Sequence, residues 1–311
     1  MPTQHGESNG VREREAVRFF SDGQRLDGEL WHPCSAPTAV VIPCSGYLGL
    51  KGLHPARFAR ALVPRGYACL SFDYRGFGFS DGERGRLLPD EQVEDIRAAV
   101  DFLSSRDDTV ALPIVLLGWG MAGALVIAEA AHDSRVAAVV ALNAIADGYR
   151  TTRAMHDEAS WAALMEQLEH DRGERLRCGR SALIPAFDVV RPQGSTRDYV
   201  HQELYKDPAY GFPVTCHATD QLLRFSVEHL VGRIAPRPLF LAHGTANDLY
   251  SPDEAERLYE LAGEQRELHL LEGAGHSEWM HDDHETFLEL IELIADFLQR
   301  SLEPINTGAA R

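Results

Sequence analysis

Several loops of this sequence hold residues that could act together on a carbonyl group. In chain order they are Cys44-Ser45-Gly46-Tyr47, residues 73–82, Gly118-Trp119-Gly120-Met121-Ala122-Gly123, residues 243–248 and Gly273-Ala274-Gly275-His276. A histidine that is oriented by a carboxylate can move a proton, and backbone amides can stabilise charge on an oxygen. The sequence therefore predicts a site for carbonyl chemistry, provided that the fold brings these loops together.

Each of these loops follows a short apolar run of the kind that forms a buried strand. The strand candidates are 38–42, 68–72, 114–117, 136–142, 238–242 and 267–271, with a hairpin formed by 15–20 and 25–31 at the start. Helical patterns separate them, and this alternation predicts an α/β fold with a mostly parallel, doubly wound sheet. Ligands bind outside the carboxyl ends of such strands, which is where the loops fall.

The alternation of strands and helices is interrupted once. From about Asp147 to Arg233 the chain is mixed and polar, and it is predicted to form a helical lid. We therefore expect an α/β core made of 12–146 and 234–300, with the lid at 147–233 between them. Residues 1–11 and 301–311 are expected to be flexible ends.

Composition and charge narrow the classes of partner. The 311 residues include 30 Lys and Arg against 47 Asp and Glu, for a formal net charge of −17. Nucleic acids and anionic membrane surfaces need basic protein surface, so neither is an expected partner. The five cysteines form no C-x-x-C pair, which argues against a disulfide framework or a zinc site.

No targeting or membrane-spanning signal is visible in the sequence. There is no run of 18 apolar residues, and residues 1–10 are polar without an apolar signal-peptide segment. We therefore expect a cytoplasmic protein. The sequence leaves the oligomeric state open, a homodimer included.

The order of these motifs resembles the α/β-hydrolase superfamily, and within it the esterase and dipeptidyl-peptidase-like branches. The resemblance covers roughly residues 15–298 and implies the α/β-hydrolase fold. In that family the turn after the strand reads G-x-S-x-G, and its serine attacks an acyl carbon. Here Gly120 stands in the place of the serine. Glycine tolerates the positive φ that the turn requires, so the turn is expected to persist without its nucleophile.

The resemblance also implies a histidine and an acid. His276 matches the catalytic histidine. The common spacing puts the acid at Asn247, whereas alignment on Pro252 puts it at Asp248. We expect Asp248, because it is an acid and one extra loop residue costs little, with Asn247 and Asp147 as the alternatives.

The same resemblance places substrate-binding groups around the site. The backbone amides of Met121 and Tyr47 match the oxyanion hole, which does not depend on side-chain identity. Arg150 and Arg153 open the lid near the strand ends, so they are the candidates for binding an anionic or carbonyl-bearing ligand.

A histidine base and an oxyanion hole without a serine suit the removal of a proton α to a carbonyl. Elimination of a β leaving group such as acetate, epimerisation, retro-aldol cleavage or decarboxylation could follow from the enolate. We therefore predict a cofactor-free lyase or isomerase acting on a small carbonyl or ester substrate. Such an enzyme would be similar to a bottromycin-pathway epimerase and to the enzymes that eliminate acetate from acetylated tetronates. These act in natural-product biosynthesis and use the α/β-hydrolase fold without an acyl-enzyme.

The same residues are also compatible with other functions. Hydrolysis could use a water held at Gly120, a serine mutated to glycine, or a nucleophile relocated to Cys44 or Ser45. The chain could also bind a ligand without turnover. Gly118, Gly120 and Gly123 match a dinucleotide fingerprint, but Asn143 stands where that motif has an acid. His281 and His284 have no metalloprotease spacing, so no metal is expected.

Overall fold

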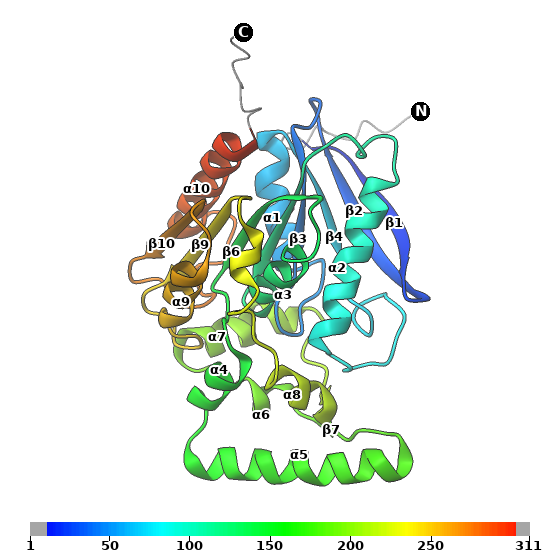
Figure 1. Cartoon of the computed structure of the whole chain (residues 1–311), viewed down its shortest axis with the longest axis vertical. Helices are drawn as coiled ribbons and strands as arrows, with labels where there is room; N and C mark the ends of the chain where they lie inside the picture. The colour runs from blue at the N-terminus through cyan, green and yellow to red at the C-terminus, as the bar shows by residue number, and fades with distance from the viewer. Residues whose placement is uncertain (1–10, 303–311) are drawn as a thin grey trace.

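One eight-stranded sheet organises the computed structural model, which describes residues 11–302 (Figure 1). Its order is β1-β2-β4-β3-β5-β6-β9-β10. Strands β1 and β2 form an antiparallel hairpin, β2 pairs antiparallel with β4, and the remaining neighbours are parallel. The strands are β1 (Val11–Ser21), β2 (Gln24–Pro33), β3 (Ala39–Cys44), β4 (Tyr67–Phe72), β5 (Ile114–Trp119), β6 (Val136–Leu142), β9 (Leu239–Gly244) and β10 (Arg266–Leu271).

The central strands are buried on both faces, as their continuous apolar sequences require. Every residue of β3, β4 and β5 is buried. Successive side chains point to opposite faces, so Val40 and Ile42 join one hydrophobic core and Val41 joins the other. The α/β fold and the mostly parallel sheet predicted from the sequence are confirmed.

Helices cover both faces of the sheet. One core takes apolar residues from α2, α3 and α9, and the other takes them from α1 and α10. Helices α1 and α2 each carry a proline in the first turn, where its missing N–H is not needed. The bounds are α1 (His54–Leu62), α2 (Pro89–Ser104), α3 (Met121–Ala130), α9 (Asp253–Leu261) and α10 (Glu285–Leu302).

A long segment between β6 and β9 carries the remaining helices and a two-stranded sheet. Its elements are α4 (Gly148–Ala154), α5 (Glu158–Cys178), β7 (Leu183–Ile184), α6 (Ala186–Val189), α7 (Gly194–Gln202), β8 (Val214–Thr215) and α8 (Cys216–Leu222). They gather below one end of the large sheet, with α5 outermost (Figure 1). The domain limits drawn from the sequence stay predictions, and the predicted flexible ends lie mostly outside the described residues.

Helix ends in this segment are set by local signals. Asp157 caps α5 by accepting a hydrogen bond from the Ser160 amide at 2.8 Å, and Gly179 ends the helix with φ 70°. None of the helices within residues 11–302 combines the length and the hydropathy that a bilayer crossing needs.

Candidate active site

The turn between β5 and α3 has the backbone shape of a nucleophile elbow, with Gly120 at its centre. Gly120 has φ 59° and ψ −124°, which residues with a side chain rarely adopt. A Cβ on Gly118 would lie 2.2 Å from the Ala122 carbonyl oxygen, and one on Gly123 would lie 2.5 Å from a neighbouring Cβ. A Cβ on Gly120 would have no neighbour closer than His276 Nε2, at 3.6 Å. The turn therefore needs glycine at its flanks but has room for a small side chain at its centre.

The loop after β3 approaches this turn closely. A Cβ on Gly46 would lie 2.6 Å from the Trp119 carbonyl oxygen, so glycine is what allows the two backbones to come this near. Tyr47 and Met121 consequently line the same cavity. Neither of their backbone amides donates a hydrogen bond to another backbone group within residues 11–302. Their role as oxyanion donors stays a prediction.

The cavity beside Gly120 has a volume of ≈ 60 Å³ and a largely apolar wall. Prominent in that wall are Trp119, Phe187, Leu249, Tyr210 and Tyr250. No aspartate or glutamate of the described chain lines it. A wider chamber of ≈ 670 Å³ adjoins it, since both are lined by Phe187, Pro192 and Val200. An apolar pocket with few polar groups is typical of a small-molecule site.

His276 lies at this cavity, packed against two aromatic rings. Its ring centroid is 4.8 Å from that of Tyr250 and 5.5 Å from that of Trp119, and the residue is 7% exposed. Burial, together with the nearby His243 and His54, lowers the pKa of His276 to about 3. The imidazole is therefore neutral at physiological pH and carries one hydrogen on one of its two nitrogens.

Asn247 occupies the place of the acid beside this histidine. Its Nδ2 lies 3.2 Å from His276 Nδ1. Its Oδ1 accepts hydrogen bonds from the backbone amides of Leu249 and Tyr250, at 3.0 and 2.9 Å. The orientation of the side-chain amide follows from these two donors, which require an oxygen opposite them. The NH₂ group therefore faces the imidazole.

The placement expected for Asp248 is wrong. Its carboxylate hydrogen-bonds to the Thr196 hydroxyl of α7, and it does not line the cavity. Asp147, the other acidic alternative, caps α4 by accepting from the Arg150 amide at 2.8 Å. The loop brings Asn247, four residues after His243, to the imidazole of His276. The loop geometry therefore decides which residue lies beside His276, although the neighbouring Asp248 is the acidic one.

The two arginines expected at the substrate lie elsewhere. Arg150 pairs with Glu254 at 2.6 Å and with Glu228 at 2.9 Å. Arg153 pairs with Glu158 and lies over the Trp161 ring. Neither arginine lines the cavity, so the structure does not place them at the site beside Gly120 as expected. Arg150 joins the inserted segment to α9 of the core through Glu254, and Arg153 makes its ion pair within the inserted segment.

Asn143, which the sequence analysis did not assign to this site, positions the histidine loop. Its Nδ2 donates to the His276 carbonyl oxygen at 2.9 Å, and its Oδ1 accepts from the Gly244 amide at 3.0 Å. Its φ of 46° is one that asparagine tolerates better than most residues. With both ends of its side chain engaged, Asn143 is not available for a ribose, which argues against the dinucleotide reading. Its place directly after a buried strand is the only sequence signal for this role.

The two residues considered as relocated nucleophiles differ in their surroundings. Burial raises the pKa of the Cys44 thiol to about 12, and its Sγ lies 3.5 Å from the Ile42 carbonyl oxygen. A thiol with that pKa is not a reactive thiolate. Ser45 is 1% exposed and lines the cavity, and its Oγ has no hydrogen-bond partner among the described residues. Buried hydroxyls are usually paired, so Ser45 is a candidate contact for a ligand.

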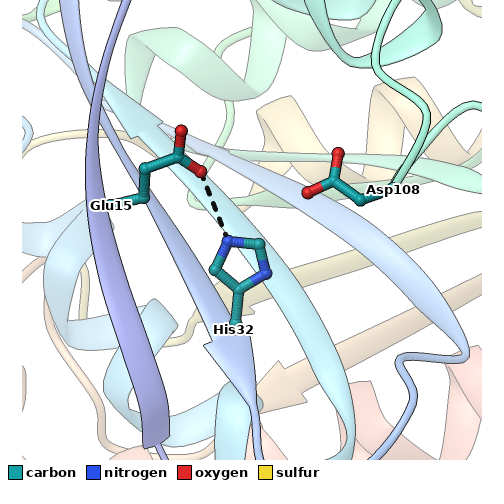
Figure 2. Close-up of side chains that lie close together, drawn as sticks. All are labelled: Glu15, His32 and Asp108. Carbon is teal, nitrogen blue, oxygen red and sulfur yellow. Dashed lines mark ion pairs between the residues drawn. The ribbon is translucent and has the colours of Figure 1, made fainter.

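A separate polar cluster lies where β1 and β2 meet the turn between α2 and β5. Figure 2 shows Glu15, His32 and Asp108 together, with His32 Nε2 3.6 Å from a Glu15 oxygen. The guanidinium of Arg106 lies 2.9 Å from both carboxylates. This cation already pairs with both carboxylates and offsets one of their two charges, so the cluster gives no argument for a bound metal.

Comparison with known proteins identifies the family. A profile of the serine aminopeptidase family S33 matches residues 35–283. The chain belongs to the α/β-hydrolase superfamily. This confirms the resemblance drawn from the motifs and places the chain in a superfamily of enzymes.

Among curated relatives, the polyketide transferase ATR5 of Stachybotrys chlorohalonatus is 28% identical, over 90% of this chain and 95% of that protein. The quorum-quenching protein AidA of Acinetobacter baumannii is 34% identical, over 58% of this chain and 59% of its own. An uncharacterised 31.7 kDa protein of Escherichia coli is 32% identical, but the chain spans only 55% of its length.

Two solved structures extend the comparison across the whole fold. The α/β hydrolase GrgF from Penicillium sp. sh18 superposes with a TM-score of 0.77 at 25% identity, covering 93% of this chain and 99% of GrgF. DcsB, solved in complex with its substrate analogue, gives a TM-score of 0.79 at 19% identity, covering 93% of this chain and 100% of DcsB. At that identity DcsB supports the fold alone.

Proposed function

We propose that this chain is a natural-product enzyme that converts a carbonyl compound as a lyase or isomerase, without an acyl-enzyme and without a cofactor. The observation that carries the proposal is Gly120, which leaves the elbow, the cavity and His276 in place but supplies no attacking atom. The polyketide transferases among the relatives support a polyketide-like substrate.

The reaction uses the charge that develops on a carbonyl oxygen. The oxygen binds to the amides of Tyr47 and Met121. The Cα–H bond of the substrate breaks, its electron pair moves toward that oxygen, and its proton passes to a basic group of the substrate itself, such as the carboxylate that leaves from Cβ. Preorganised donors stabilise such an oxyanion strongly in a dry site, where removal of one donor costs about 10²–10³ in kcat. Departure of a β leaving group such as acetate, or return of a proton to the α carbon, completes an elimination or an isomerisation.

Hydrolysis is the competing function, and one observation favours it. The position that a Cβ would take on Gly120 is 3.6 Å from His276 Nε2, so a water could stand there. That water would need Nε2 to accept its proton. Asn247 faces Nδ1 with a donor, and this arrangement argues against a base at Nε2.

The experiment is incubation of the purified chain in D₂O with a β-acetoxy ketone and with polyketide-type esters, followed by mass spectrometry. We expect either elimination of acetic acid from the substrate or incorporation of deuterium at its α carbon. A β-hydroxy ketone, which is one water heavier than the enone formed by elimination, would instead establish hydrolysis. Saturable binding without turnover would establish a binding protein. His276→Ala tests the site itself and should abolish turnover while retaining the thermal melting profile. Full activity of that variant would reject the site.

A further inference from the structure

We propose that Asn247 is a positioning residue that locks His276 in the tautomer with its hydrogen on Nε2, so that the imidazole donates to the substrate oxygen. This deepens the proposed function and rests on it for the identity of the reaction. The hydrogen-bond pattern itself does not depend on that reaction. The donor role replaces the base role that the sequence suggests for His276.

The orientation of the Asn247 side chain is the first step. In the reverse orientation, Oδ1 could accept from His276 and from His243, whose Nε2 is also 3.2 Å from this end of the side chain. The backbone amides of Leu249 and Tyr250 would then face an NH₂ group. Neither amide has another acceptor within the described chain, and a part-buried amide without an acceptor is strongly unfavourable.

The tautomer of His276 follows from this orientation. Nδ1 accepts a hydrogen from Asn247, so the single hydrogen of the neutral ring resides on Nε2. Nε2 is the nitrogen that lies nearest to Gly120. A serine hydrolase needs the opposite arrangement, because its acid accepts from Nδ1–H and leaves Nε2 free to take the proton of the serine.

Two residues of this site depart from the serine-hydrolase pattern, and both departures remove a part of the machinery for nucleophilic attack. Gly120 removes the attacking oxygen, and Asn247 removes the base that would activate it. In a serine protease, asparagine in place of the triad acid alone lowers kcat by about 10⁴ because it stabilises the wrong tautomer. The site is thus reorganised around hydrogen-bond donation and is more than a hydrolase that lacks its nucleophile.

The rest of the cavity supplies no substitute for the lost base. No carboxylate of the described residues lines it. His54 is the other imidazole, and its Nε2 is 3.3 Å from the Tyr199 hydroxyl. That hydroxyl donates to the Met280 carbonyl oxygen at 3.0 Å, so it accepts from His54. Burial also lowers the pKa of His54 to about 3, which makes it a weak base.

A donor-only site selects a substrate that brings its own proton acceptor. A β-acyloxy carbonyl compound meets this requirement. Its Cα–H and Cβ–O bonds break, the Cα=Cβ bond forms, and the departing carboxylate takes the α proton to leave as a carboxylic acid. Charge builds on the carbonyl oxygen meanwhile, where Nε2–H of His276 and the amides of Tyr47 and Met121 stabilise it.

The tautomer can be measured directly by long-range ¹H–¹⁵N NMR on the full chain labelled with ¹⁵N-histidine. Loss of signals in His276→Gln identifies the residue. We expect a hydrogen on Nε2 between pH 5 and 8, in a ring that His243, His54 and Tyr250 surround. In Asn247→Asp the hydrogen should move to Nδ1. The matched control Asp248→Asn keeps an oxygen that can accept from the Thr196 hydroxyl, so it should leave the signals unchanged. A wild-type ring protonated on Nδ1 would overturn the proposal.

Restoring the triad gives a second, chemical test. We expect Gly120→Ser to react slowly with a fluorophosphonate probe, and Gly120→Ser combined with Asn247→Asp to react about 10³–10⁴ times faster. Gly120→Ser combined with Asp248→Asn is the control and should match the single variant. If Gly120→Ser and the variant with both Gly120→Ser and Asn247→Asp reacted with the probe at the same rate, or if neither reacted, the role of Asn247 would be overturned. Because neither test uses the proposed substrate, a failed elimination assay beside an Nε2–H tautomer would reject the proposed reaction alone.

Discussion

At Gly120 the cavity has room for a side chain, but the backbone conformation disfavours one. A Cβ there has only ordinary contacts, yet φ 59° is unfavourable for any residue that carries one. We expect Gly120→Ala to lower the free energy of unfolding by about 1–3 kcal/mol, the usual range for such backbone strain. Urea denaturation would measure the change. An equally stable variant would show that the turn relaxes and that glycine is retained for the space it leaves.

Ser45 should show opposite effects on stability and on ligand binding. Its buried Oγ has no partner in the described structure, and an unpaired buried polar group costs about 1–3 kcal/mol. Ser45→Ala should therefore keep or raise the melting temperature, while binding of a carbonyl ligand weakens. Calorimetric titration beside thermal melting would test this, with Ser277→Ala, in the same cavity wall, as the comparison. A melting temperature lowered by several degrees would show that the hydroxyl is paired in solution.

Sequence reasoning reached most of this site but failed where a loop decides the geometry. Gly120, Met121 and Tyr47 follow strands that are buried along their whole length, and His276 follows β10, which is largely half-buried. The order of the strands in the sheet brings these four residues together. The choice of Asp248 over Asn247 rested on residue type. The backbone amides of Leu249 and Tyr250 determine which side chain turns toward the imidazole, and no composition or spacing rule reports their direction.

At the scale of elements, Asn143 joins the ends of β6 and β9 to the loop that carries His276. Asn143→Ala removes two buried hydrogen bonds and leaves the Gly244 amide and the His276 carbonyl oxygen without these partners. We expect a loss of about 2–6 kcal/mol, at about 1–3 kcal/mol for each of the two groups left unpaired. Urea denaturation and the NMR signals of His276 would report it. A stable variant whose His276 signals do not shift would show that the loop is held by other contacts.

Helix α7 forms part of the cavity wall and is tied to the core through Asp248. Asp248→Ala removes its hydrogen bond to Thr196, a contact with a charged group of the kind worth about 1.5–3 kcal/mol. Hydrogen exchange of α7 should accelerate and KM should rise, while kcat is largely retained. A collapse of kcat with unchanged exchange would return Asp248 to the catalytic role expected from its residue type.

The contrast between the core and the inserted segment has a physical origin. Strands buried on both faces need continuous apolar runs, and these are visible without any structure. Helix α5 has 21 residues, but only Leu164, Leu168 and Asp171 are buried. Its sequence therefore contains little hydrophobic pattern from which its packing could be predicted. Its position depends on ion pairs such as Arg172 with Asp220, which residue spacing does not reveal.

At the scale of the whole molecule, the buried histidines should control stability in mild acid. Burial lowers the pKa of both His54 and His276 to about 3, against an ordinary value of about 6.5. Between these values the unfolded chain binds protons that the folded chain does not, so stability is complete above pH 6.5 and is lost as the pH falls. Each extra proton contributes a slope of about 1.4 kcal/mol per pH unit. The raised pKa values of buried Asp95 and Glu129 have the opposite effect in more acidic solution.

The free energy of unfolding should therefore decrease from pH 6.5 to 5.5, and urea denaturation across this range would measure it. His54→Gln keeps a donor for the Tyr199 hydroxyl but has no titrating group, so its decrease from pH 6.5 to 5.5 should be smaller by about 1 kcal/mol, because an unfolded histidine is only half protonated at its own pKa. The exposed His170 gives the matched control, and His170→Gln should leave the slope unchanged. If His54→Gln kept the wild-type slope, His54 would be protonated in the folded chain. The cavity would then be wetter than its burial indicates, and the preference for a neutral imidazole beside Gly120 would weaken with it.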